Sequence, residues 1–360
     1  MVKKAFISDC EGPISKNDNA YEITSQFVPE GSRLYAVISR YDDVLADVLK
    51  RPGYKAGCTL KLILPFLKAY GTTDRKMREF SAAKLVLIPD TKNTLQHVRS
   101  IAQAFIVSTS YEHYIKALCQ ALDFPYENTY CTKVSIDKYI LNEREKNQLG
   151  KLAAEIAQMH VIGLPLNAES EQDFPDDDRE TIHRLDEIFW KEIQNMRIGR
   201  IYSDVNPIAG SGKAEAIEEV VQRLKINLSS VMYVGDSITD EEAFKLVRKG
   251  EGLTVSFNGN QYAVKNAEIA VLSESSTPTA MIANVFLRFG KKQAIRLAEN
   301  WSLEALKKNQ VSQSLLERFG FQTDKSCRVE VVNNENVEEL IRESTEFRRK
   351  VRGEAVGSLG

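Results

Sequence analysis

The 360-residue sequence predicts an α/β fold, a doubly wound parallel-sheet core with helical cap insertions. Three short apolar runs, at residues 5–7, 104–107 and 231–234, each lead directly into acidic or small polar residues. The runs are continuous rather than alternating in polarity, which is typical of parallel strands buried on both faces of a sheet. Helical patterns follow the second and third runs, and strand-then-helix units of this kind favour a doubly wound sheet.

The elements around these runs follow from local patterns. After the second run, "YEHYIKALCQAL" places Tyr114, Leu118 and Leu122 at helical spacing. After the third run, "DEEAFKLVRKG" begins with acids, which suit a helix N-terminus, and ends at Gly250, which suits a C-cap. The stretches "GLTVSFNGN" and "AEIAVLS" then predict two further strands.

Two long stretches between these units carry helical patterns and are predicted to be insertions into the core. The first contains "YDDVLADVLKR" and "LKLILPFLKAYG", and the second contains "NQLGKLAAEIAQM" and "ETIHRLDEIFWKEIQNM". We therefore predict an α/β core at 1–16, 96–134 and 198–290, a helical cap insertion at 17–95, a second helical insertion at 135–197, and a charged helical C-terminal extension at 291–360.

The composition argues against several classes of protein. Hydrophobic residues make up 43% and charged residues 27%, as expected for a soluble globular protein, and a net charge of −2 disfavours bulk binding of nucleic acid or anionic lipid. No apolar run is long enough to predict a membrane span or a signal peptide. The five cysteines form no CxxC pair, which fits a reducing compartment. We expect a cytoplasmic protein without nucleic-acid partners or membrane insertion.

The predicted strands deliver polar side chains to one edge of the sheet, where doubly wound folds bind ligands. Asp9 and Asp236 would meet there, and two close carboxylates favour a hard divalent cation such as Mg²⁺ between them. Ser108 offers a hydroxyl beside backbone N–H groups at a helix start, and Lys213 offers a positive charge. These are the groups needed to transfer a phosphoryl group through an aspartyl-phosphate.

Four motifs in order resemble those of the haloacid dehalogenase superfamily of phosphatases and phosphotransferases. "FISDCEG" matches the first motif in part, "FIVSTS" the second, "GSGKAEAI" the third, and "VGDSITD" the fourth in full. The resemblance implies a Rossmann-like core whose caps are inserted after the first motif and between the second and third. Both long helical stretches lie at those points.

The resemblance also implies a role for each matching residue. Asp9 is similar to the nucleophile of the family, and Glu11 stands where the general acid/base stands. Ser108, Thr109 and Lys213 correspond to the phosphate-binding positions. The metal site implied in this way comprises Asp9, Glu11 through its backbone carbonyl, Asp236 and Asp240, with Mg²⁺ as the cofactor.

Glu11 departs from the commoner pattern, because most phosphatases of this superfamily have Asp at that position. Glutamate is one methylene longer, so proton delivery has to be re-aimed. A minority branch, resembling phosphoserine phosphatase and phosphoserine:homoserine phosphotransferase, uses Asp-x-Glu-Gly, and "DCEG" matches it. We therefore interpret Glu11 as an active acid/base.

Together these motifs predict a Mg²⁺-dependent phosphohydrolase that acts on a small phosphate monoester. Two alternatives stay open. "DCEGPISKND" and the two-insertion layout also resemble the archaeal family labelled energy-converting hydrogenase A, subunit R. That label concerns genomic association with a membrane hydrogenase and implies nothing about the chemistry of these residues, but it raises the alternative of a non-catalytic accessory or regulatory subunit associated with a hydrogenase complex. The second alternative is a phosphotransferase.

Overall fold

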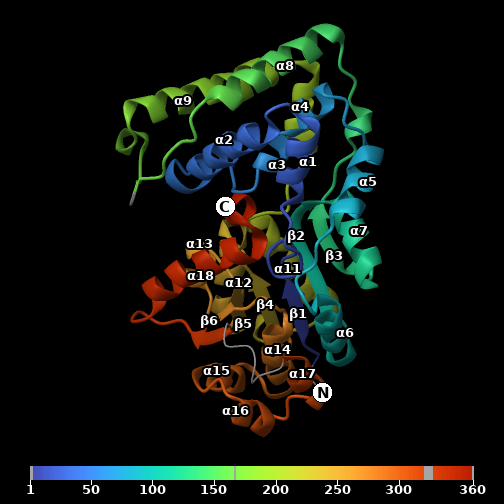
Figure 1. Cartoon of the computed structure of the whole chain (residues 1–360), viewed down its shortest axis with the longest axis vertical. Helices are drawn as coiled ribbons and strands as arrows, with labels where there is room; N and C mark the ends of the chain where they lie inside the picture. Colours follow the sequence, from blue (N-terminus) through green and yellow to red (C-terminus); the bar gives the residue numbers. More distant parts are fainter. Residues whose placement is uncertain (1–2, 166–167, 320–326, 359–360) are drawn as a thin grey trace.

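The computed structural model describes residues 3–165, 168–319 and 327–358. Its centre is a seven-stranded sheet in the order β3-β2-β1-β4-β5-β6-β7 (Figure 1). All neighbouring strands are parallel except β6 and β7, which are antiparallel. The strands are β1 (Ala5–Ser8), β2 (Gln103–Tyr111), β3 (Thr129–Thr132), β4 (Val231–Gly235), β5 (Leu253–Phe257), β6 (Ile269–Leu272) and β7 (Arg328–Val331).

Helices cover both faces of this sheet, as the continuous apolar strands require. In β1, Ile7 packs into the apolar cluster on one face and Phe6 into the cluster on the other. The first face carries α11 (Ser211–Leu224), α12 (Glu241–Lys249), α13 (Gln261–Asn266) and α18 (Val337–Arg352). The second carries α6 (Thr91–Ile101), α7 (Glu112–Leu122), α14 (Thr277–Phe289), α15 (Lys291–Glu299), α16 (Leu303–Lys308) and α17 (Gln313–Phe319). The predicted doubly wound α/β fold is confirmed.

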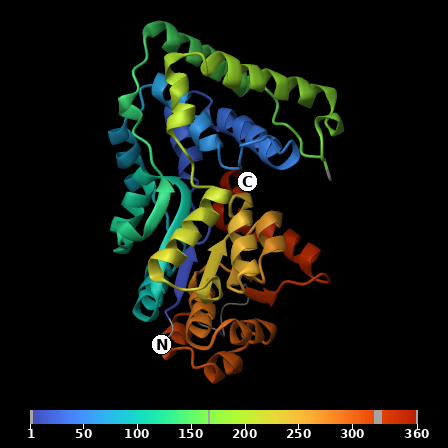
Figure 2. The ribbon, with the colours of Figure 1, turned by 180° about the vertical axis from the view of Figure 1, so that it is seen from behind.

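A helical layer lies beyond the carboxyl ends of the strands, above the sheet in Figure 1 and again in the reverse view of Figure 2. It is built from α1 (Asn19–Phe27), α2 (Gly31–Asp43), α3 (Thr59–Leu62), α4 (Leu64–Ala69), α5 (Asp74–Lys84), α8 (Glu143–Gln158), α9 (Asp176–Glu187) and α10 (Ile201–Asp204). Side chains from both predicted insertions, such as Leu34 and Leu149, share one apolar cluster. The domain boundaries themselves remain a prediction; α6 begins at Thr91, inside the first predicted insertion, yet packs on the sheet.

Several elements differ locally from their sequence patterns. The helix predicted from "YDDVLADVLKR" ends in a π-helical turn, Val44–Val48, which continues α2. A second π-helical turn, Ile188–Ile193, continues α9. "LKLILPFLKAYG" is divided into α3 and α4, with Pro65 in the first turn of α4. The short strands β3 and β7 had no clear signal in the sequence. Among the described helices, none has the length and apolarity needed to cross a bilayer.

Candidate active site

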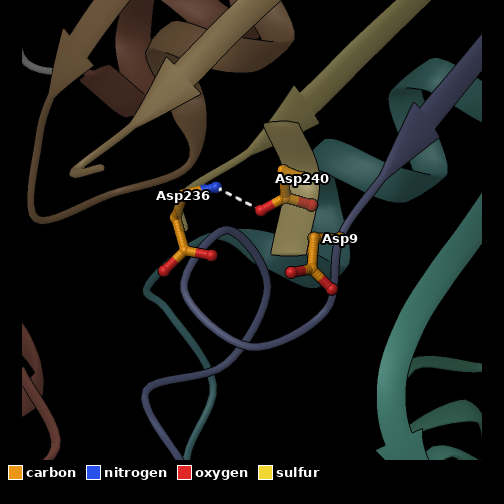
Figure 3. Close-up of side chains that lie close together, drawn as sticks. All are labelled: Asp9, Asp236 and Asp240. Carbon is orange, nitrogen blue, oxygen red and sulfur yellow. Dashed lines mark hydrogen bonds between the residues drawn. The ribbon is translucent and has the colours of Figure 1, made fainter. Parts of the chain in front are cut away.

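The site lies where β1 and β4 end side by side. Ser8 pairs in register with Val234, so Asp9 and Asp236 follow at the same edge of the sheet. The backbone N–H of Asp9 donates to the carbonyl of Val234 at 2.8 Å, which fixes this alignment. Figure 3 shows the carboxylates of Asp9, Asp236 and Asp240 gathered here. The predicted convergence of the first and fourth motifs is therefore present.

Two glycines allow these carboxylates to pack against the backbone. Gly12 has φ +107°, and a Cβ at that position would lie 2.3 Å from Cγ of Asp236. A Cβ at Gly235 would lie 2.5 Å from Cγ of Asp240. Any larger residue would displace one of the two carboxylates, so the glycines of "DCEG" and "VGDSITD" are required by close approach.

Lys213 connects the nucleophile position to the fourth motif. The side chain is fully buried in the first turn of α11, and its Nζ donates to Asp9 Oδ2 at 2.7 Å and to Asp240 Oδ1 at 2.6 Å. Burial lowers the pKa of Lys213, but the attraction of the Asp240 and Asp9 carboxylates outweighs it and raises the pKa above its ordinary value. The ammonium therefore stays charged between the two acids.

Asp240 accepts two hydrogen bonds on each of its carboxylate oxygens. Its Oδ1 accepts hydrogen bonds from Lys213 and from the hydroxyl of Tyr233 at 2.6 Å. Its Oδ2 accepts from the backbone N–H groups of Asp236 at 2.9 Å and Ser237 at 3.0 Å. Four donors saturate a carboxylate. Asp240 thus holds the loop that carries Asp236.

Asp9 is one of the carboxylates that line the cavity beside the cluster. Its Oδ1 accepts from the backbone N–H of Cys10 at 2.6 Å, and its Oδ2 accepts from Lys213. Burial raises the pKa of Asp9 to about 7, and the nearby Asp240 and Asp236 contribute in the same direction against Lys213. The side chain is still within reach of the cavity that it helps to line.

Asp236 is held by two arginines that the sequence analysis did not single out. Arg348 and Arg352, one turn apart on α18, both donate through Nη1 to Asp236 Oδ2, the second at 3.1 Å. Both guanidinium groups are almost entirely buried. In the sequence, both arginines belong to a helix pattern of mixed charge, and helices of this kind ordinarily face solvent.

The carboxylate of Glu11 is hydrogen-bonded at the start of the helical layer. Its Oε1 accepts from the backbone N–H of Asn19, at the start of α1, at 2.6 Å. Burial raises the pKa of Glu11 well above its ordinary value, and the nearby Asp18 adds to this shift. The side chain lines the same cavity as Asp9.

The second motif supplies hydroxyl groups at the end of β2. Ser108 Oγ donates to Ser110 Oγ at 3.1 Å and accepts from the backbone N–H of Ser110 at 3.2 Å. Thr109 also lines the cavity, and its buried hydroxyl finds no partner among the described residues. A buried unpaired hydroxyl beside the start of α7 is free to bind an anion.

The cavity between sheet and helical layer is small, about 100 Å³. Its floor is formed by Asp9, Glu11, Ser108, Thr109, Asp236, Ser237, Ile238 and Thr239. The helical layer contributes Asp18, Tyr35, Ser39, Asp42, Asp43, Gly57, Thr59 and Leu60, and α18 contributes Arg348 and Arg352. A space of this size, lined largely by polar and charged residues, suits a small ligand rather than a polymer.

The acidic cluster fits a hard divalent cation. Ligand atoms of Asp9, Asp236 and Asp240 lie within 4.8 Å of one another, and all are carboxylate oxygens, which Mg²⁺ prefers. Because Asp240 is saturated, Asp9 and Asp236 are the carboxylates able to ligate, and one oxygen of Asp236 points toward Asp9 (Figure 3). The guanidinium groups of Arg348 and Arg352 both contact Oδ2 of the same Asp236 carboxylate.

Comparison with known proteins places the chain among hydrolases. The family model of haloacid dehalogenase-like hydrolases matches residues 87–282, more than half of the sequence. A solved structure of a gene product from Archaeoglobus fulgidus is 23% identical, with a TM-score of 0.81 and 99% of each chain covered, so the two share a fold. A solved structure of phosphoserine phosphatase in its apo form is 12% identical, covers 80% of this chain and 100% of its own, and has a TM-score of 0.42. No curated protein matches the sequence.

Proposed function

Because the chain belongs to the haloacid dehalogenase-like hydrolase family, we propose that it is a Mg²⁺-dependent phosphohydrolase. Its substrate would be a small phosphate monoester, and the reaction would pass through an aspartyl-phosphate on Asp9. One observation carries the proposal: the Asp9 carboxylate faces a small polar cavity while a fully buried Lys213 fixes its other side. We place the reaction in the cytoplasm.

In the first half-reaction, an oxygen of Asp9 attacks the phosphorus and the bond to the substrate oxygen breaks. Glu11 donates its proton to the departing oxygen, a role consistent with its raised pKa. Lys213 holds Asp9 in one orientation and reduces its repulsion with the incoming phosphate. Ser108 and Thr109 hydrogen-bond the phosphoryl oxygens at the end of β2.

In the second half-reaction, Glu11 takes a proton from water, which attacks the phosphorus and releases inorganic phosphate from Asp9. Mg²⁺ held by Asp9 and Asp236 would supply positive charge that offsets the charge of the phosphoryl group. Asp240 contributes by positioning, since it holds Lys213 and the backbone N–H of Asp236. The metal ligands and the role of each residue are parts of the proposal.

The test is an assay of phosphate monoesters with Mg²⁺, comparing the parent with Asp9→Asn. We expect the variant to lose at least about a thousandfold in kcat, because an amide cannot act as the nucleophile. Asp123→Asn is the matched control, since Asp123 is an exposed residue in the left-handed C-cap of α7, a conformation that Asn also adopts. Equal turnover by the parent and Asp9→Asn would refute the role of Asp9.

The resemblance to the archaeal hydrogenase-associated family leaves a non-catalytic accessory role as the alternative. That role predicts no turnover on any phosphate monoester and co-purification with a membrane hydrogenase complex. The saturated network around Lys213 and Asp240 supports catalysis, because a scaffold has no need to gather buried carboxylates. A phosphotransferase would instead show faster turnover when an alcohol acceptor is added.

A further inference from the structure

The C-terminal helix α18 brings two permanent positive charges to the acidic cluster. Arg348 and Arg352 both contact Asp236 Oδ2, and Arg348 also donates to the backbone carbonyl of Asp236 at 3.2 Å. Each guanidinium side chain is only 4% exposed, and the Asp236 side chain is 1% exposed. These are buried ion pairs rather than surface contacts.

Among the side chains joined by ion pairs to the three aspartates, the positive charges come from Lys213 and from α18. Within this ion-paired group, the carboxylates of Asp9, Asp236 and Asp240 are matched in number by the cations of Lys213, Arg348 and Arg352. Without the two arginines the same group would carry two uncompensated negative charges. A divalent cation would supply the same two positive charges, and buried charges need such compensation.

The helix is attached at several points beyond Asp236. Ser344 Oγ donates to the carbonyl of Gly259 at 2.6 Å, and Leu340 packs in an apolar cluster with α13 and β6. Arg352 also donates to the carbonyls of Lys16 at 3.1 Å and Asn17 at 2.5 Å, just beyond the first motif. The arginines are therefore held in place by a docked helix, and their position is coupled to the loop that follows Asp9.

We propose that α18 competes with the divalent cation for Asp236. Arg348 and Arg352 neutralise Asp236 when no metal is bound, and they must release its carboxylate before the metal takes full hold. This inference rests on the metal site of the proposed function, but not on any turnover. Two guanidinium groups and a divalent cation on one carboxylate repel each other strongly in a buried site.

The test measures binding of Mn²⁺ alone, followed by electron paramagnetic resonance, in the full chain. The variant Arg348→Gln/Arg352→Gln should bind Mn²⁺ roughly tenfold or more tightly than the parent, within the usual range of coupling between two ligands. Arg349→Gln is the matched control, because Arg349 lies on the same helix, is 44% exposed and pairs with Glu354. Its affinity for Mn²⁺ should equal that of the parent. Unchanged or weaker binding by the double variant would overturn the competition.

Asp236→Asn separates failure of this inference from failure of the metal site. If Asp236→Asn binds Mn²⁺ as tightly as the parent does, the metal site of the proposed function is wrong. The proposed competition between α18 and the cation is then refuted as well. If Asp236→Asn loses binding while the double arginine variant matches the parent, the metal site stands and only the competition is refuted.

Hydrogen exchange of the parent chain gives a second measurement that does not depend on any variant folding. Because coupling is reciprocal, saturating Mn²⁺ should loosen α18, so amides in Val337–Arg352 should exchange faster with the metal than without it. Equal or slower exchange of these amides would contradict the proposal.

Discussion

The two aspartates of the hexapeptide GDSITD differ in where their partners come from. On the core side, Asp240 is held by Lys213, by Tyr233 and by the backbone that precedes it. On the C-terminal side, Asp236 is held by Arg348 and Arg352, which lie 112 and 116 residues further along the chain. On the core side, donors from the α/β core occupy the acceptor positions of Asp240. The C-terminal side depends on α18, and under the proposed competition with a divalent cation it is the side whose contacts with Asp236 can be exchanged.

The largest expected effect comes from breaking the core side at Lys213. Lys213→Met leaves Asp9 and Asp240 buried without their shared cation, so the free energy of unfolding should fall by about 3–5 kcal/mol. Urea denaturation at fixed pH measures this. The control Lys245→Met removes the ion pairs of a half-exposed lysine with Glu241 and Glu242 and should cost less than about 1 kcal/mol. A loss at Lys213 as small as that at Lys245 would mean that the core side is not a structural brace.

A smaller effect is expected from the other donor to Asp240. Tyr233→Phe deletes the hydroxyl that lies 2.6 Å from Asp240 Oδ1, and a hydrogen bond to a charged group contributes about 1.5–3 kcal/mol. Tyr202→Phe is the control, because the buried Tyr202 hydroxyl has no partner among the described residues. Thermal unfolding should show a clear loss for Tyr233→Phe and none for Tyr202→Phe. A loss for Tyr233→Phe no larger than that for Tyr202→Phe would show that the hydrogen bond to Asp240 does not stabilise the fold.

The smallest effect concerns Glu22, beside the loop on which Arg352 docks. Asn17 Nδ2 donates to both Glu22 oxygens, at 2.8 and 2.9 Å, and burial raises the pKa of Glu22 from 4.5 to about 7. A raised carboxyl pKa favours the folded state below pH 4.5, and this contribution is lost as the pH rises to about 7. Glu22 is partly exposed, so solvent screening should keep the loss below about 1 kcal/mol.

Denaturation of the parent and Glu22→Gln at pH 5 and pH 8 measures this contribution. The parent should lose more stability than Glu22→Gln between the two values, because the amide cannot ionise. Glu79→Gln, which alters an exposed residue, should follow the parent at both values. A parent that gains stability relative to Glu22→Gln as the pH rises would contradict the sign of the shift.

The sequence predicted the core side better than the C-terminal side for a physical reason. Asp9 and Asp236 directly follow apolar strands, so the pairing of β1 with β4 is enough to bring them together. Lys213 and Asp240 lie in short motifs near the start of a helix, so the spacing within each motif also predicts where these side chains lie. Arg348 and Arg352 had no such signal, because alternating charges on a helix look the same whether they face solvent or a buried carboxylate.

Other features of the fold could not be predicted from local sequence patterns, for similar reasons. The strands β3 and β7 are short and sit at the two edges of the sheet, where burial is one-sided and apolar runs are not required. The single apolar cluster shared by both insertions depends on contacts between residues far apart in sequence. The contact of Glu11 with Asn19 depends on where α1 begins relative to the first motif.

The most direct measurement looks for the phosphoryl group on Asp9 itself. The chain is mixed with a phosphate monoester and Mg²⁺, quenched in acid during turnover, digested with pepsin at acid pH, where an acyl phosphate survives, and analysed by mass spectrometry. The peptide that contains Asp9 should carry a phosphoryl adduct that is absent from Asp9→Asn. Turnover of the substrate with no adduct on this peptide would contradict covalent catalysis by Asp9.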